Sequence, residues 1–164
     1  MSVRLEGSCR CRAVRFSVET HTPQPYQLCY CSICRKTAGG GGYAINLMGA
    51  SATLDVRGRD AVRVFRAEIA GEDGHCRRSE AERHFCSGCG CALWLFDPRW
   101  SDLVHPFASA IDSELPVPPE RVHIMLRFKA NWVEPEIGRF DSTFDEYPEQ
   151  SIEDWHRSRG LWVE

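Results

Sequence analysis

Nine cysteines are the residues with the most specific chemistry in this 164-residue chain. Seven of them form three short clusters: Cys9 and Cys11; Cys29, Cys31 and Cys34; Cys86 and Cys89. Thiolates are preferred ligands of zinc, and cysteines two or three residues apart can reach one ion. The chain opens without the apolar stretch of a signal peptide, and in a reducing compartment such clusters indicate metal before disulfides. The sequence therefore predicts a cytoplasmic protein that binds metal.

The clustered cysteines divide into a set of four and a set of three. Zinc takes four ligands in a tetrahedron, so the two distant pairs each supply half of a closed, structural centre. The triple cluster is one ligand short of closure, and an open fourth position distinguishes catalytic from structural zinc. We therefore expect two Zn²⁺ ions, one structural and one catalytic, with Cys29, Cys31 and Cys34 around the catalytic ion.

The charge of each centre sharpens this distinction. Four thiolates leave zinc with a net charge of −2, whereas three leave −1 and a vacant position, so only the second centre is much of a Lewis acid. A free thiol has a pKa of about 8.5, but a thiol that coordinates zinc is deprotonated outright. The triple cluster therefore predicts a centre that positions a thiolate nucleophile.

Other residues near the clusters leave alternatives open. Cys91 follows Cys89 by two residues and can close the triple cluster, which would make both ions structural. His123 either lines the open site or is an ordinary strand residue. Cys76 is expected to be a small buried or half-buried hydrophobic residue rather than a ligand. His84 either orients a thiolate from beside Cys86 or packs as a strand histidine.

The elements that must hold these residues are short strands broken by Gly, Pro and Asp turns, which predict an antiparallel β domain. The candidate strands include 13–18, 43–47, 61–66, 93–96 and 122–128, with Phe85 in a further one. Gly71 to Gly74 indicates a hairpin connection. Helices are predicted only at 32–38, before four glycines, and at 151–159, where Ser151 and Asp154 have capping spacing.

Composition limits the classes of function. The length fits one domain, and 43% hydrophobic residues with a net charge of −3 are typical of a globular protein. Residues 1–133 carry 17 basic against 14 acidic residues, and residues 134–164 carry 3 against 9. No dense basic stripe or long apolar run is present, so we expect neither a nucleic-acid partner nor a membrane span. Trp155, Leu161 and Trp162 predict that the acidic tail docks on the body.

Four motifs together resemble the glutathione-dependent formaldehyde-activating enzyme family, which also includes centromere protein V-like domains. They are G-S-C-x-C-x-A-V-R-F from Gly7, C-x-C-S-x-C-R-K-x-x-G from Cys29, F-C-S-G-C-G from Phe85, and His123-Ile124 followed by Trp132. The resemblance covers roughly residues 3 to 135. Tyr30, where the family often has histidine, departs from the pattern, and the acidic tail has no counterpart in it.

The resemblance implies a mainly β fold with antiparallel sheets organised around zinc and short helices, shared with Rab-accessory zinc proteins and zinc-bearing methionine sulfoxide reductases. It implies a structural zinc on Cys9, Cys11, Cys86 and Cys89 and a catalytic zinc on Cys29, Cys31 and Cys34. The implied activity is a carbon–sulfur lyase of the S-(hydroxymethyl)glutathione synthase type, acting on a thiol such as glutathione and a small aldehyde such as formaldehyde. Arg35 and Lys36 either meet a carboxylate of such a ligand or are solvated.

From these observations we expect a zinc-binding domain at residues 1–135 and a docked acidic C-terminal extension at residues 136–164. The alternative function is a non-catalytic scaffold with two zinc ions that binds a protein or a small ligand.

Overall fold

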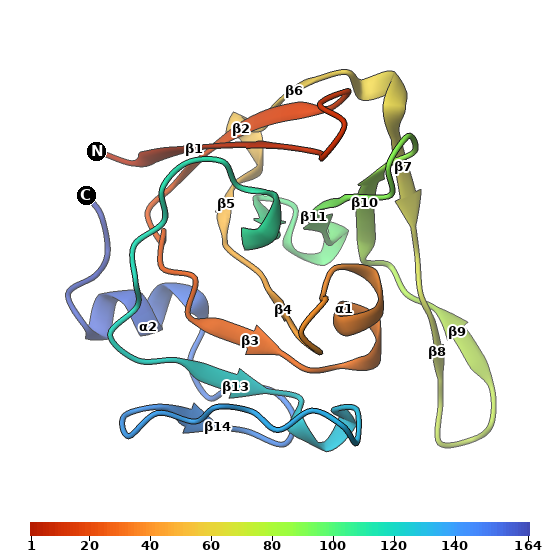
Figure 1. Ribbon diagram of the computed structural model, residues 1–164, viewed down its shortest axis with the longest axis vertical. Coiled ribbons are helices and arrows are strands. Elements are labelled where there is room, and N and C mark those ends of the chain that lie inside the picture. The colour runs from red at the N-terminus through yellow and green to blue at the C-terminus, as the bar shows by residue number, and fades with distance from the viewer.

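The computed structural model describes residues 1–164 and is mainly β, with antiparallel sheets and only two short α-helices, as the sequence predicts (Figure 1). Short 3₁₀ turns connect several strands, at Ser51–Thr53, Arg59–Ala61, Pro98–Trp100, Ala108–Ala110 and Leu126–Phe128. Neither α-helix has the length or the apolar stretch needed to cross a membrane.

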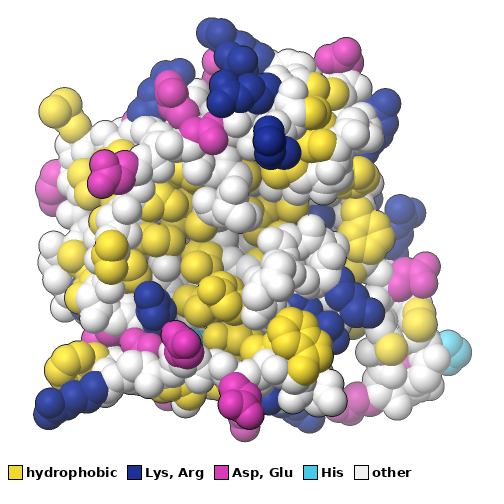
Figure 2. Space-filling model, in the orientation of Figure 1, with side chains coloured by type: hydrophobic (Ala, Val, Ile, Leu, Met, Phe, Trp, Pro, Cys, Tyr) yellow, Lys and Arg dark blue, Asp and Glu magenta, His cyan; other side chains and the backbone are white.

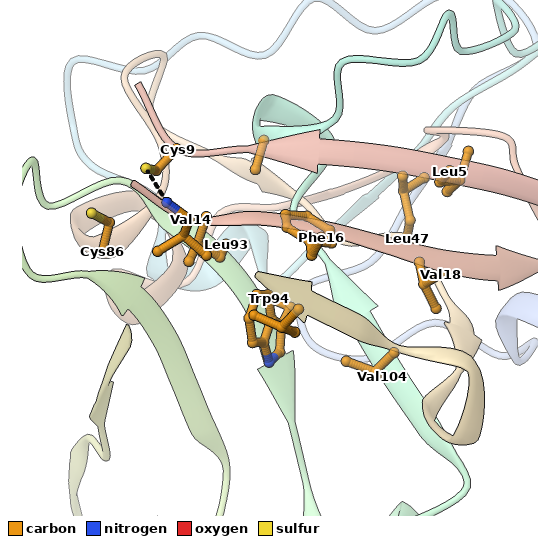
Figure 3. Close-up of a cluster of buried hydrophobic side chains, with 12 residues drawn as sticks. Leu5, Cys9, Val14, Phe16, Val18, Leu47, Cys86, Leu93, Trp94 and Val104 are labelled. Atoms are coloured by element: carbon orange, nitrogen blue, oxygen red, sulfur yellow. Dashed lines mark hydrogen bonds between the residues drawn. The ribbon is translucent and has the colours of Figure 1, made fainter. Parts of the chain in front are cut away.

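Two antiparallel sheets pack around the largest hydrophobic core. One has the order β1-β2-β6, and the other has the order β5-β12-β11-β10-β7. Their strands are β1 (Val3–Ser8), β2 (Arg15–Thr20), β5 (Gly49–Ala50), β6 (Asp55–Arg57), β7 (Val62–Phe65), β10 (Glu82–Cys86), β11 (Ala92–Phe96) and β12 (Leu103–Pro106). Alternate residues of β2, such as Phe16 and Val18, point inward and meet Trp94 and Val104 from the larger sheet (Figure 3).

A third sheet lies against a second core and has the order β14-β13-β3-β4. Its strands are β3 (Gln27–Cys29), β4 (Ala44–Ile45), β13 (Val122–Ile124) and β14 (Ser142–Thr143). β13 runs parallel to both β3 and β14, so this sheet departs from the antiparallel pairing expected from sequence. Short sequence patterns carry no information on this pairing, because the two partners of β13 come from segments far before it and well after it.

The predicted strand at 122–128 ends early. Met125 has a φ of 60°, which places it in the left-handed region, and residues 126–128 form a 3₁₀ turn instead. The chain therefore leaves the sheet immediately after Ile124, whose carbonyl accepts a hydrogen bond from the Tyr30 N–H.

The predicted hairpin around Gly71 to Gly74 connects β8 (Glu68–Ala70) and β9 (Cys76–Arg78), and it projects from the body (Figure 1). Gly74 has a φ of +79°, a conformation that favours glycine. Cys76 is exposed on this hairpin, so the expectation that it is a buried hydrophobic residue is wrong.

The two α-helices begin as their sequences predict. In α1 (Ser32–Thr37) the Cys31 side chain accepts from the Cys34 N–H, and in α2 (Ile152–Ser158) the Ser151 side chain accepts from the Asp154 N–H. α2 carries Trp155, which is 1% exposed and stacks on Tyr26 with ring centroids 3.6 Å apart. The acidic tail therefore packs against the body through this tryptophan.

Charged side chains are unevenly distributed over the surface. Arginines gather at the end that carries β1, β2 and β6 (Figure 2). Arg15 and Arg57 lie directly opposite each other on β2 and β6, with acidic residues such as Asp55 close by.

Candidate metal centres

The first candidate centre joins two tight turns that are far apart in the sequence. Its sulfurs, which belong to Cys9, Cys11, Cys86 and Cys89, all lie within 4.8 Å of one another. The first turn follows β1 and is closed by a hydrogen bond from the Arg12 N–H to the Cys9 carbonyl. The second follows β10 and is closed by one from the Gly90 N–H to the Cys86 carbonyl. Gly90 takes a φ of 73°, which allows this second turn to reverse sharply.

The contacts within this cluster are close. The Cys11 sulfur lies 3.5 Å from that of Cys9 and 3.6 Å from that of Cys86. The Val14 N–H donates to the Cys9 sulfur at 3.2 Å (Figure 3). Cys9 and Cys86 are buried at the end of the first core, whereas the other two cysteines are exposed. None of the four forms a disulfide, and four convergent thiols are the donor set of a closed zinc site.

The second candidate centre lies where β3 passes into α1. Cys29 ends the strand, Cys31 caps the helix and Cys34 lies in its first turn, so one short segment brings all three sulfurs within 4.8 Å of one another. Cys29 and Cys34 are 6% and 4% exposed, and Cys31 is half-buried. Hydrogen bonds with the other two thiols lower the pKa of Cys31 and raise that of Cys29.

Arg83 is a neighbour of the three-cysteine cluster that sequence analysis missed. Its guanidinium nitrogens lie 3.7 and 3.8 Å from the Cys34 sulfur. Arg83 is on β10 and faces away from the first core, because its neighbour His84 pairs with Trp94 on the opposite face. No local motif marks this arginine, and only the packing of β10 against α1 brings it to the thiols. It places a positive charge beside a cluster of potential thiolates.

Neither proposed fourth ligand joins the three-cysteine cluster. The Cys91 thiol points to the Ala92 carbonyl instead. His123 shares the face of Leu28, its partner in the parallel register, so it lies on the opposite side of the strand from Cys29. The Tyr30 hydroxyl lies 2.9 Å from Nδ1 of His123.

Nε2 of His123 lies 3.1 Å from the Asp141 carboxylate. Burial raises the pKa of Asp141, but hydrogen bonds from the N–H groups of Arg121 and Gly138 and from His123 outweigh it and lower this pKa. Both ring nitrogens of His123 therefore have hydrogen-bond partners other than the cysteines.

The other residues that the sequence singled out, His84, Arg35 and Lys36, do not join either cysteine cluster. His84 stacks on Trp94 with centroids 5.1 Å apart and makes no hydrogen bond to a cysteine. Arg35 and Lys36 lie in the last turn of α1, close in sequence to the three-cysteine cluster. Nε of Arg35 is buried and has no hydrogen-bond partner within the protein.

Fold and sites together define a small, mainly β protein with one four-thiol and one three-thiol candidate metal centre. The family model described as "Glutathione-dependent formaldehyde-activating enzyme" matches residues 4–127, a range that contains all seven clustered cysteines. The chain belongs to this family.

A similar protein from Halomonas elongata is 59% identical over 157 residues, which cover 96% of this chain and 97% of that protein. Its name is "Putative glutathione-dependent formaldehyde-activating enzyme". A crystal structure of a Rhodobacter sphaeroides protein covers 68% of this chain and 91% of its own, with a TM-score of 0.50 and 22% identity. That likeness concerns the fold alone.

Proposed function

We propose that this protein is a zinc-dependent carbon–sulfur lyase of the S-(hydroxymethyl)glutathione synthase type, which joins a thiol such as glutathione to a small aldehyde such as formaldehyde. The observation that carries the proposal is the cluster of three thiols without a fourth protein ligand, in a chain of this family. The four-thiol cluster is proposed as a structural zinc site and the three-thiol cluster as the catalytic one.

The three sulfur donors of the proposed catalytic cluster are ligands that suit a zinc ion. Three thiols converge from one segment, and Cys29 and Cys34 are shielded from water. When bound there, zinc would lower the pKa of an incoming thiol and polarise a carbonyl oxygen. The half-buried Cys31 marks the side of the cluster from which solvent and substrates approach.

The proposed reaction needs no redox partner. The sulfur of the thiol attacks the aldehyde carbon, a carbon–sulfur bond forms, and the π bond of the carbonyl breaks. The thiol proton ends on the former carbonyl oxygen, so atoms and electrons balance. The three cysteines would hold the zinc, and the Arg83 guanidinium, 3.7 Å from the Cys34 sulfur, would offset part of the negative charge of the thiol cluster.

An exchange measurement tests this proposal. Exchange NMR follows the rate at which glutathione and ¹³C-formaldehyde interconvert with their adduct, with and without zinc-loaded protein. We expect the wild-type chain to accelerate exchange and Cys34→Ser to abolish the acceleration. Cys76→Ser is the matched control, because this thiol is exposed on the distant hairpin.

The outcome separates the two functions that the sequence left open. Wild-type acceleration that survives in Cys34→Ser would show that the three-thiol cluster is not the reaction site. Two bound zinc ions without acceleration or glutathione binding in the wild type would favour the non-catalytic scaffold.

We also propose the division into a metal-binding domain at residues 1–135 and an acidic extension at residues 136–164. The end of the family match at residue 127 and the docking of α2 through Trp155 support it. The extension also supplies β14 to the third sheet, so the two parts share one sheet. The nine free thiols suit a reducing compartment, and the proposed location is the cytoplasm.

A further inference from the structure

A recess of about 470 Å³ opens between the five-stranded sheet and the short edge strand β6. Its floor is apolar and buried, with Val56, Trp94 and Val104 exposed by 8%, 3% and 0%. β6 contributes only three residues to its sheet. The three-stranded sheet therefore leaves part of the five-stranded sheet uncovered on the side toward β7 and β10. Ligand sites are commonly of this kind, with an apolar floor and few polar groups.

The polar groups around the recess offer more donors than acceptors. Arg59 stands on its rim and takes part in none of the ion pairs of the protein. The indole nitrogen of Trp94 points away from Phe16 in the core (Figure 3). Glu82 also lines the recess, but its carboxylate is paired with Arg66. The other carboxylate oxygen of Glu82 lies 3.7 Å from Nε2 of His84, so the one negative charge of the recess already has partners, whereas the positive charge of Arg59 has none.

Aromatic rings shape the interior. His84 lies against Trp94 with an interplanar angle of 21°, and Phe96 is the next residue of β11 on the same face. Nδ1 of His84 is buried and has no hydrogen-bond partner in the protein. Aromatic side chains of this kind favour an aromatic guest, because ring pairs gain energy beyond the area they bury.

The recess is separate from both candidate metal centres. On β10, Arg83 and His84 point to opposite faces of the sheet, and only Arg83 reaches the three-cysteine cluster. None of the seven clustered cysteines lines the recess. A ligand here would therefore not depend on the proposed carbon–sulfur chemistry.

We propose that this recess binds a small aromatic carboxylate, with the ring between His84, Phe96 and the edge of Trp94 and the carboxylate toward Arg59. A carboxylate fits because the guanidinium of Arg59 can donate two parallel hydrogen bonds to it. An aromatic body fits because the floor is apolar and lined by rings. A neutral analogue of the same shape lacks the anion that Arg59 would pair with.

Calorimetry on the zinc-loaded full chain tests the proposal, with phenylacetate as the probe and phenylacetamide as its neutral analogue. We expect phenylacetate to bind and phenylacetamide to bind at least several-fold more weakly, on the order of the tenfold that a charge-assisted hydrogen bond contributes. Arg59→Gln should weaken phenylacetate by about the same factor. Arg57→Gln is the matched control, an exposed arginine two residues away that does not line the recess.

A second variant tests the location of binding. Ser101→Trp adds bulk at the rim and should abolish phenylacetate binding, with the melting temperature measured to verify folding. Cys34→Ser should bind phenylacetate as the wild type does, which separates this site from the proposed function. The proposal is wrong if 10 mM phenylacetate gives no binding, if the amide binds equally well, or if Arg59→Gln and Arg57→Gln behave alike.

Discussion

The two cysteine clusters differ in what they join. The four-cysteine cluster connects turns that follow β1 and β10, with Cys11 and Cys86 separated by 75 positions. The three-cysteine cluster lies within six residues of one strand–helix junction. A metal that closes a long loop removes more conformational entropy from the unfolded chain than one that closes a short loop, by about 0.6 kcal/mol for each doubling of loop length. This difference supports the structural role proposed for the first cluster and leaves the second available for the proposed catalytic role.

The clusters also lie at different cores. Cys9 and Cys86 belong to the core between the two larger antiparallel sheets. Cys29 and Cys34 belong to the second core, which also contains Trp155 from the acidic tail. The surroundings of the second cluster thus depend on a segment beyond the family match, whereas those of the first do not.

The largest expected effect is at the four-cysteine cluster. Cys86→Ser should remove the metal and yield little soluble protein, because a structural zinc can supply roughly 10–16 kcal/mol to folding. Soluble yield, zinc content and melting temperature measure this. A stable, soluble Cys86→Ser protein with metal at the other cluster would invert the assigned roles.

At the three-cysteine cluster the same change should spare the fold. Cys34→Ser is expected to remain folded, to keep about one zinc per chain at the other cluster, and to lose glutathione binding. Zinc content by mass spectrometry and a thermal melt check this. Collapse of this variant alongside Cys86→Ser would favour two structural sites.

The contribution of the acidic tail to the stability of the protein can be measured at Trp155 in the second core. Trp155→Ala should lower the free energy of unfolding by about 3–5 kcal/mol, the range for removing a large buried aromatic side chain. Trp132→Ala is the control, since Trp132 is 66% exposed and should change stability by less than about 0.5 kcal/mol. Urea denaturation measures both, and equal effects would show that the tail does not support this core.

The charge beside the three thiols has a smaller expected effect. Arg83→Gln should slow glutathione–formaldehyde exchange by about tenfold, because it removes a charge-assisted contact with the Cys34 sulfur. Zinc content should stay unchanged, and Arg83→Lys should recover part of the rate. An unchanged rate in Arg83→Gln would remove this arginine from the mechanism.

The stability of the folded protein should fall modestly at acid pH because of His156 in α2. Burial lowers the pKa of His156 below its ordinary 6.5, and its Nε2 accepts a hydrogen bond from the Gln24 N–H, which a protonated ring cannot do. The folded protein therefore binds fewer protons than the unfolded chain, so the free energy of unfolding falls as pH drops below about 6.5. Urea denaturation between pH 7 and 5 should show a smaller fall in His156→Gln than in the wild type, and parallel curves would contradict this cause.

Much of this organisation could be predicted from sequence where the signal is local. The spacing of the cysteines predicted both groupings, and the capping pattern at Ser151 predicted α2. The sequence predicted that the strand beginning at residue 122 continues through residues 126–128. It could not reveal the early end, because the left-handed conformation of Met125 leaves no sequence pattern. Arg83 and the orientation of His123 depend on sheet register and on the packing of distant strands, which local periodicity does not encode.

Native mass spectrometry with glutathione tests most directly the claim that one cluster holds the fold and the other reacts. The wild-type chain should carry two zinc ions and bind glutathione, and mild chelation should leave a folded chain with one zinc and no bound glutathione. Cys34→Ser should match the chelated state from the outset. Loss of both ions together with the fold, or glutathione binding that persists on the chain with one zinc, would contradict the account.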